Sequence, residues 1–89
     1  YMKLVVVDWT DSCSMTGGPW HSVESIKEDI NKQSLACRSV GWLIAESKDA
    51  IVLVAHQAFG TKEAELNQVS GDMTIPKCAI EKMKVLLKK

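Results

Sequence analysis

The amino-acid sequence predicts a mainly β domain, namely a small, bent, antiparallel barrel of five strands with one short helix between the first and second strands. Three observations predict it. Short aliphatic and β-branched runs alternate with segments rich in Gly, Ser and Asp. The longest run, Leu35–Glu46, contains Gly41, which lets a strand bend sharply. The chain closes with two strand-like runs separated by Pro76, a residue that cannot donate to a β-ladder.

Length and composition set the class of protein. The 89 residues, 46% of them hydrophobic, suit one domain over residues 1–89. Eleven Lys and Arg balance eleven Asp and Glu, so the formal net charge is zero. Non-specific nucleic-acid binding rests on a basic surplus, so any such site must come from local clustering or from symmetry that repeats a few lysines. No apolar run has the length of a membrane span or a signal peptide, so we expect no membrane partner.

The three cysteines favour a reducing environment. Cys13, Cys37 and Cys78 are odd in number, widely spaced and without a Cys or His at metal-ligand spacing. This pattern argues against a disulfide framework and a structural zinc site. We therefore expect a cytoplasmic protein with no metal and no cofactor.

The first strand and the loop after it are read from composition. Lys3–Val7 is a β-branched run that predicts a strand, ending at Asp8. Ser12–Pro19 is rich in Ser and Gly and predicts a loop.

A short helix follows that loop. Ser22 is a suitable N-cap. Val23, Ile26 and Ile30 then recur at helical spacing on one face. We expect this face to cover one end or face of the sheet.

The remaining strands follow in sequence. Leu35–Glu46 and Ala50–Ala55 flank a polar turn and predict a hairpin. His56–Asp72 is polar and glycine-containing, which predicts a long loop. Asp72–Ile75 then predicts a strand, and the last strand starts at about Ala79 after the proline kink.

Two segments resemble the motifs of the Sm and LSm proteins. The hairpin Val40–Leu53 is similar to the first Sm motif, which has a glycine in a bent strand, a leucine two residues on, a polar turn and a strand that ends in leucine. The closing segment Asp72–Leu87 is similar to the second motif, with aliphatic side chains at Ile75, Ile80 and Met83. The hairpin pattern is shared with other SH3-like barrels.

A shorter match lies within the closing segment. Lys77-Cys78-Ala79-Ile80 resembles the Lys-His-Ala-Ile segment of the bacterial RNA chaperone Hfq, with cysteine in place of histidine. The chain departs from the Sm pattern where Pro76 and Lys77 replace Arg-Gly, and where the helix follows the first strand. The overall pattern also resembles small, functionally uncharacterised bacteriophage proteins, for which the compartment would be the host cytoplasm.

The resemblance implies a homo-oligomeric ring. In Sm-like proteins the strand after the long loop pairs with the last strand of the adjacent subunit, and this heterologous contact closes a ring. The residues that it would place at the interface are Met73, Ile75, Val85 and Leu87. It would also place Lys77 near the pore, with Lys48 on the same surface, to bind single-stranded RNA. Alternatively, Lys77 is a solvated lysine at a strand end.

A second candidate site surrounds the glycine-containing loop. Trp9, Asp11, Ser12 and Trp20 flank it and form a possible ligand loop, because indoles stack on bases and carboxylates accept from ribose or amines. The structural alternative is that the two tryptophans fasten loop and helix to the barrel, while Asp11 and Ser12 cap turns.

No catalytic residue is assigned, because the chain contains none of the nucleophile, phosphate-loop or metal-hydrolase motifs. The leading hypothesis is a ring-forming RNA-binding module. The alternative is a non-enzymatic ring of phage origin that sequesters a ligand or adapts one protein to another.

Overall fold

The structure, a computed structural model, describes residues 2–12, 18–30, 34–60 and 66–88. Part of the predicted glycine-containing loop, including Cys13, lies outside the described residues. The elements in chain order are β1 (Lys3–Ser12), α1 (Val23–Asp29), β2 (Ser34–Glu46), β3 (Ala50–Val54), β4 (His56–Phe59), β5 (Leu66–Ser70), β6 (Met73–Pro76), the 3-10 turn η1 (Lys77–Ala79) and β7 (Ile80–Lys88).

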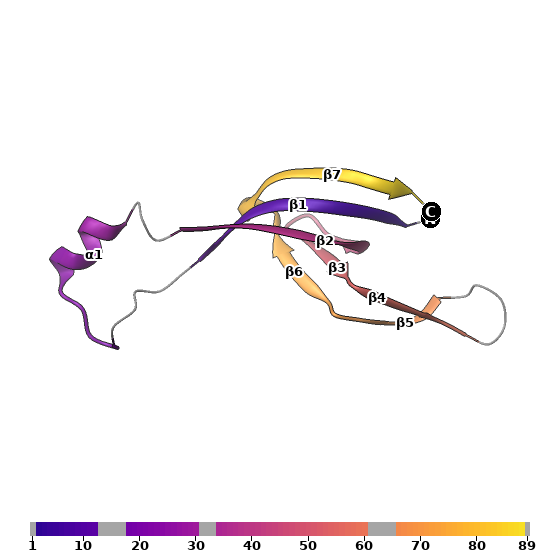
Figure 1. The fold of residues 1–89 in the computed structure, drawn as a ribbon, viewed down its shortest axis with the longest axis horizontal. Coiled ribbons are helices and arrows are strands. Elements are labelled where there is room, and N and C mark those ends of the chain that lie inside the picture. Colours follow the sequence, from indigo (N-terminus) through magenta and orange to yellow (C-terminus); the bar gives the residue numbers. More distant parts are fainter. Residues whose placement is uncertain (1, 13–17, 31–33, 61–65, 89) are drawn as a thin grey trace.

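Five of the strands form one bent antiparallel sheet in the order β6-β3-β2-β1-β7 (Figure 1). Strands β4 and β5 pair separately. The mainly β class and the single helix after the first strand are therefore confirmed. The closed barrel is not, because β6 and β7 stand at opposite ends of the strand order and do not pair with each other.

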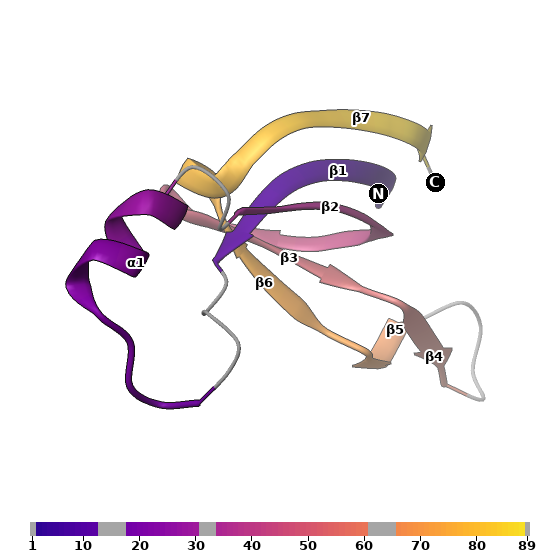
Figure 2. The same ribbon diagram turned by 60° about the vertical axis from the view of Figure 1, so that its left-hand side comes forward.

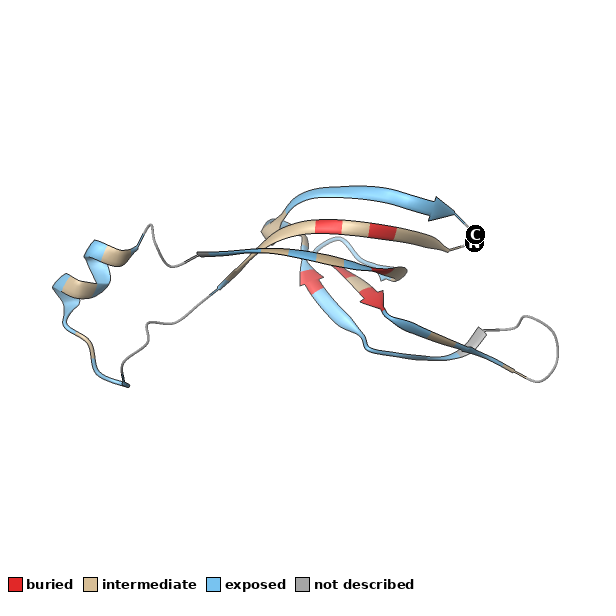
Figure 3. Ribbon diagram, in the orientation of Figure 1, coloured by how far each residue is buried: buried red, intermediate tan, exposed pale blue. Residues whose placement is uncertain are grey.

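The core lies inside the bend of the sheet. Its buried residues lie on β1, β3 and β6, where the ribbon is red in Figure 3, and are Val5, Val7, Ile51, Leu53 and Ile75. Gly41 on β2 pairs with Val5 on β1. A Cβ at Gly41 would lie 3.1 Å from the Cβ of Leu53, so the absence of a side chain lets β3 cross close to β2.

The predicted kink near the C-terminal end is confirmed. Strand β6 ends at Pro76, which pairs with Ala50 at the start of β3. One 3-10 turn follows, and its first residue, Lys77, donates its backbone N–H to the carbonyl of Asp49 at 2.8 Å. β7 then runs back along β1, with Ile80 opposite Trp9. The proline thus ends one edge strand and the turn redirects the chain to the other edge.

The first strand is longer than predicted. It continues through Asp8 to Ser12, because β2 pairs with it over this whole length. β7 pairs with it only as far as Trp9, so the two strands continue beyond Trp9 as a two-stranded ribbon. Asp8 is accommodated in the strand because Arg38 lies directly opposite and binds its carboxylate. The sequence-based prediction ended the strand at Asp8 because polar residues follow. Polar residues are nevertheless suitable in a β-ribbon whose faces are exposed to solvent.

The helix does not cover the sheet, contrary to prediction. Its N-cap is confirmed, since the Ser22 hydroxyl accepts from the backbone N–H of Ser25 at 3.1 Å. Figures 1 and 2 show α1 standing apart from the sheet, beyond the end of the β1–β2 ribbon. Its apolar residues Val23, Ile26 and Ile30 are all exposed. The ribbon carries the helix outward, so within the described chain no layer packs on its apolar face.

The predicted long loop contains a second hairpin. Strands β4 and β5 pair from His56 opposite Ser70 to Phe59 opposite Leu66. The backbone N–H of Ala55 also donates to the carbonyl of Ser70 at 3.2 Å, so pairing begins where β3 ends. Phe59 and Val69 are exposed on this hairpin. A strand without a buried face needs no alternation of apolar and polar residues, so the sequence did not predict these two strands.

Gly71 forms the turn between this hairpin and β6. We expect Gly71→Ala to lower the free energy of unfolding by about 1–3 kcal/mol. Its φ is +70°, and a Cβ there would lie 2.9 Å from the Cβ of Ala55. Gly18→Ala is the matched control, because Gly18 has a φ of +113° and its added Cβ would meet no non-adjacent atom of the described residues within 4 Å. Urea denaturation of both variants measures the difference; equal losses would contradict a role for the contact with Ala55.

Candidate functional site

The kink and the β2–β3 turn meet at one end of the sheet, and this meeting brings the two predicted RNA-binding lysines to the same region. The Lys77 backbone is bonded to Asp49, as described above, and its Nζ lies 2.7 Å from Oε2 of Glu46. Lys48 is exposed in the turn between Ser47 and Ala50, which closes through a 2.9 Å backbone hydrogen bond.

Two carboxylate side chains, those of Glu46 and Asp49, belong to the same region as these lysines. The hydrogen bond from Lys77 and the attraction of its charge hold the pKa of the Glu46 carboxyl below its ordinary value. Both side chains are partly exposed, so solvent screens the pair. With Asp49 in the turn, two acids stand beside two lysines. An anionic ligand at this site must therefore compete with Glu46 for Lys77.

The four residues of the possible ligand loop do not converge. The indole N–H of Trp9 donates to the Ser39 hydroxyl at 3.0 Å, and the ring packs against the core. Asp11 and Ser12 end β1, where Oδ1 of Asp11 accepts from the Ser12 backbone at 2.8 Å. Trp20 is 91% exposed. Trp9 thus packs on the sheet itself, whereas the Trp20 side chain is exposed.

The predicted interface residues lie on the two outermost strands, but not all at the surface. Met73 on β6 is 44% exposed, and Val85 and Leu87 on β7 are similarly exposed. Ile75 is fully buried in the core, opposite Ile51. Only the backbone of Ile75, and not its side chain, remains to contact another chain.

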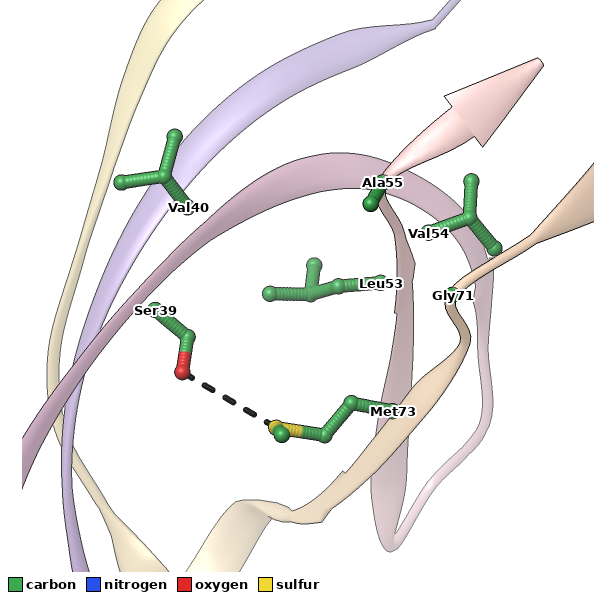
Figure 4. Close-up of a pocket in the computed structure, with 7 residues that line it drawn as sticks. All are labelled: Ser39, Val40, Leu53, Val54, Ala55, Gly71 and Met73. Carbon is green, nitrogen blue, oxygen red and sulfur yellow. Dashed lines mark hydrogen bonds between the residues drawn. The ribbon is translucent and has the colours of Figure 1, made fainter.

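A small, mainly apolar hollow of about 210 Å³ lies beside β6. Figure 4 shows residues from β2, β3 and β6 around it, with the Ser39 hydroxyl directed at the sulfur of Met73. That contact, at 3.8 Å, joins β2 to β6, which lie on either side of β3. The hollow has one weak polar pair and no charged wall, so it suits an aliphatic side chain better than a polar ligand.

The cations on the outer face of the sheet were not singled out from the sequence. Arg38 on β2 and Lys82 on β7 flank Asp8, which lies between them on β1. Lys84 is two residues further along β7. The sequence feature that could have predicted this group of cations is the alternation of Lys82 and Lys84 with Met83 and Val85. In a strand, this alternation places both lysines on one face.

Within the described ranges, no three His, Cys, Asp or Glu side chains are grouped as metal ligands. Cys37 and Cys78 are free thiols. No helix in the part of the chain that the structure describes has the length and apolar character needed to cross a membrane.

The chain matches no family model, and neither the curated proteins nor the solved structures contain a match to it. The similarity to Sm-like proteins therefore rests on the residues of the β2–β3 hairpin and the closing segment alone.

Two ion pairs predict how stability depends on pH. Hydrogen bonds from Arg38 and Lys77 lower the folded-state pKa values of Asp8 and Glu46. As the pH falls, the two carboxylates are therefore protonated first in the unfolded chain. The free energy of unfolding decreases as the pH drops toward and through their folded-state pKa values. We expect wild type to lose more stability between about pH 5 and pH 3 than the double variant Asp8→Asn/Glu46→Gln, measured by urea denaturation. Parallel losses would show that the pairs do not contribute.

Proposed function

We propose that this protein is a non-enzymatic, ring-forming binding module of the Sm-like kind, and that its rings bind single-stranded RNA. The observation that carries the ring is the strand order β6-β3-β2-β1-β7, because among the described strands it leaves one backbone edge of β6 and one of β7 unpaired. Unpaired edges bind strands of other chains. Joining the β6 edge of one copy to the β7 edge of the next is a heterologous contact, and such contacts close into rings when the rotation permits.

The side chains along these edges support the same contact. Met73 on β6 and Val85 and Leu87 on β7 are apolar and exposed. Pairing the two edges would remove part of their surface from water, which stabilises by roughly 25 cal/mol per Å² of apolar area. The gain matters because the core cluster, among the described residues, has five buried side chains.

The RNA site is proposed at Lys77 and Lys48. The fold brings their segments together through the backbone bond between Lys77 and Asp49. A cyclic assembly would repeat the two lysines in every copy, together with Glu46 and Asp49. The ring would therefore offer several lysines to one RNA strand, without a net positive charge at the site. An RNA phosphate would displace Glu46 from Lys77, and the partial exposure of both side chains makes that exchange accessible.

A second candidate is a ring that sequesters a small ligand or adapts one protein to another. The ion pair between Lys77 and Glu46 favours it, because the lysine already has an anionic partner. The 91% exposure of Trp20 favours it further, since large exposed aromatic side chains are common at protein interfaces.

Charge on the β7 edge should prevent assembly. We expect the wild-type protein to have a mass of several chains by light scattering after size exclusion, and Val85→Lys to have the mass of one chain, because a lysine blocks apolar edge pairing. Val23→Lys on α1 is the control, since Val23 is also exposed but lies away from both edges, and it should assemble normally. A monomeric wild-type protein would refute the ring.

Removing the Lys77 charge should weaken RNA binding. We expect Lys77→Ala to raise the Kd for a labelled oligouridylate of about 15 nucleotides at least about tenfold at low salt, measured by fluorescence anisotropy. Lys27→Ala, a change at an exposed lysine of α1, should leave the Kd unchanged. If Lys77→Ala assembles and binds like wild type, the RNA site is elsewhere; if no RNA binds at all, the second candidate is favoured.

A further inference from the structure

The outer face of the sheet, opposite the core, contains a cationic groove of about 290 Å³. It crosses the neighbouring strands β2, β1 and β7. The residues that line it are Val6, Asp8, Arg38, Lys82, Lys84 and Leu86. None of them belongs to the candidate sites described above, and the groove does not include Lys77.

Strand register places these side chains on one face. Asp8 is directly opposite Arg38 on one side and Lys82 on the other, and Val6 is directly opposite Lys84. Directly opposed residues of antiparallel strands point to the same face. Val5 and Val7, which alternate with Val6 and Asp8, are buried in the core, so this face points away from it.

Arg38 is held in a fixed position in the groove. Its Nε lies 2.7 Å from Oδ1 of Asp8, and its Nη2 lies 3.2 Å from Oδ2. These two bonds use two of the five guanidinium N–H groups, and the side chain is 71% exposed. The remaining N–H groups are therefore available to an anion, and the guanidinium that carries them is already oriented.

The groove has a surplus of positive charge although the whole chain is neutral. Arg38, Lys82 and Lys84 face one carboxylate, that of Asp8. Glu81 lies beyond the end of the groove, where its Oε1 accepts from the Thr10 hydroxyl at 3.1 Å. Lys82 and Lys84, two residues apart on one strand, are about 7 Å from each other along β7. This row suits an extended anion with regularly spaced charges.

The apolar part of the lining indicates the class of that anion. Val6 and Leu86 lie beside the lysines in the groove. A nucleic-acid strand combines repeated phosphates with the apolar faces of sugars and bases, so it can use both parts of the lining. An acidic peptide would use the cations, but its carboxylates vary in spacing from one sequence to another.

We propose that this groove binds the phosphate backbone of a single-stranded nucleic acid, with Arg38, Lys82 and Lys84 contacting phosphates and Asp8 positioning Arg38. The site is complete within one copy of the chain. It depends neither on ring closure nor on Lys77.

The test is a salt titration of oligouridylate binding by anisotropy, with wild type and Lys82→Gln/Lys84→Gln. We expect the double variant to bind about tenfold more weakly at about 50 mM salt, and the slope of log K against log salt to fall by about 1.4, because two phosphate contacts are lost. Lys82→Arg/Lys84→Arg should retain the wild-type slope, and Lys27→Gln should change neither quantity. Circular dichroism of each variant checks that the sheet is intact.

The outcomes separate this site from the proposed one. If the double glutamine variant keeps the wild-type affinity and slope, the groove is not a nucleic-acid site, whatever Lys77→Ala does. If Lys77→Ala binds normally while the double variant binds weakly, the groove stands and the pore site falls. A labelled polyglutamate peptide is the second probe: if it binds more tightly than oligouridylate and only its binding is lost in the double variant, the partner is an acidic protein and the proposal is overturned.

Discussion

The turn that follows Pro76 is the constraint on which the rest of the structure depends. Proline ends β6, and the backbone bond from Lys77 to Asp49 holds the turn against the β2–β3 hairpin. β7 is thereby sent to β1, at the far side of the sheet from β6. This turn thus places Ile75 in the core and brings Lys77 beside Glu46. Among the described residues, it also leaves the outer edges of β6 and β7 without a partner strand.

The charges of this neutral chain are distributed unevenly once it is folded. At the kink, Lys77 and Lys48 stand beside Glu46 and Asp49, so positive charge is locally offset. On the outer face, Arg38, Lys82 and Lys84 share a single carboxylate. The two surfaces therefore differ in what an anion must do: it exchanges with Glu46 at the first and adds to an already oriented guanidinium at the second.

The elements read correctly from the sequence are those whose signal is local. The N-cap at Ser22 and the kink at Pro76 each follow from the chemistry of a single residue. The errors concern partners. The polar end of β1, up to Ser12, and the hairpin β4–β5 form because another segment pairs with them. In an exposed two-stranded ribbon this pairing requires no periodic alternation of apolar residues, so the sequence does not reveal it.

By itself, the sequence determined the β class, the hairpin, the terminal kink and the amphipathic character of α1, because glycine, proline and side-chain alternation act over a few residues. Only the tertiary structure decided where each face points. It left Val23 and Trp20 exposed and buried Ile75. It also set Arg38, Asp8 and Lys82 in one row. The physical reason is that strand register joins residues far apart in the chain, and a composition with zero net charge contains no record of which charges become neighbours.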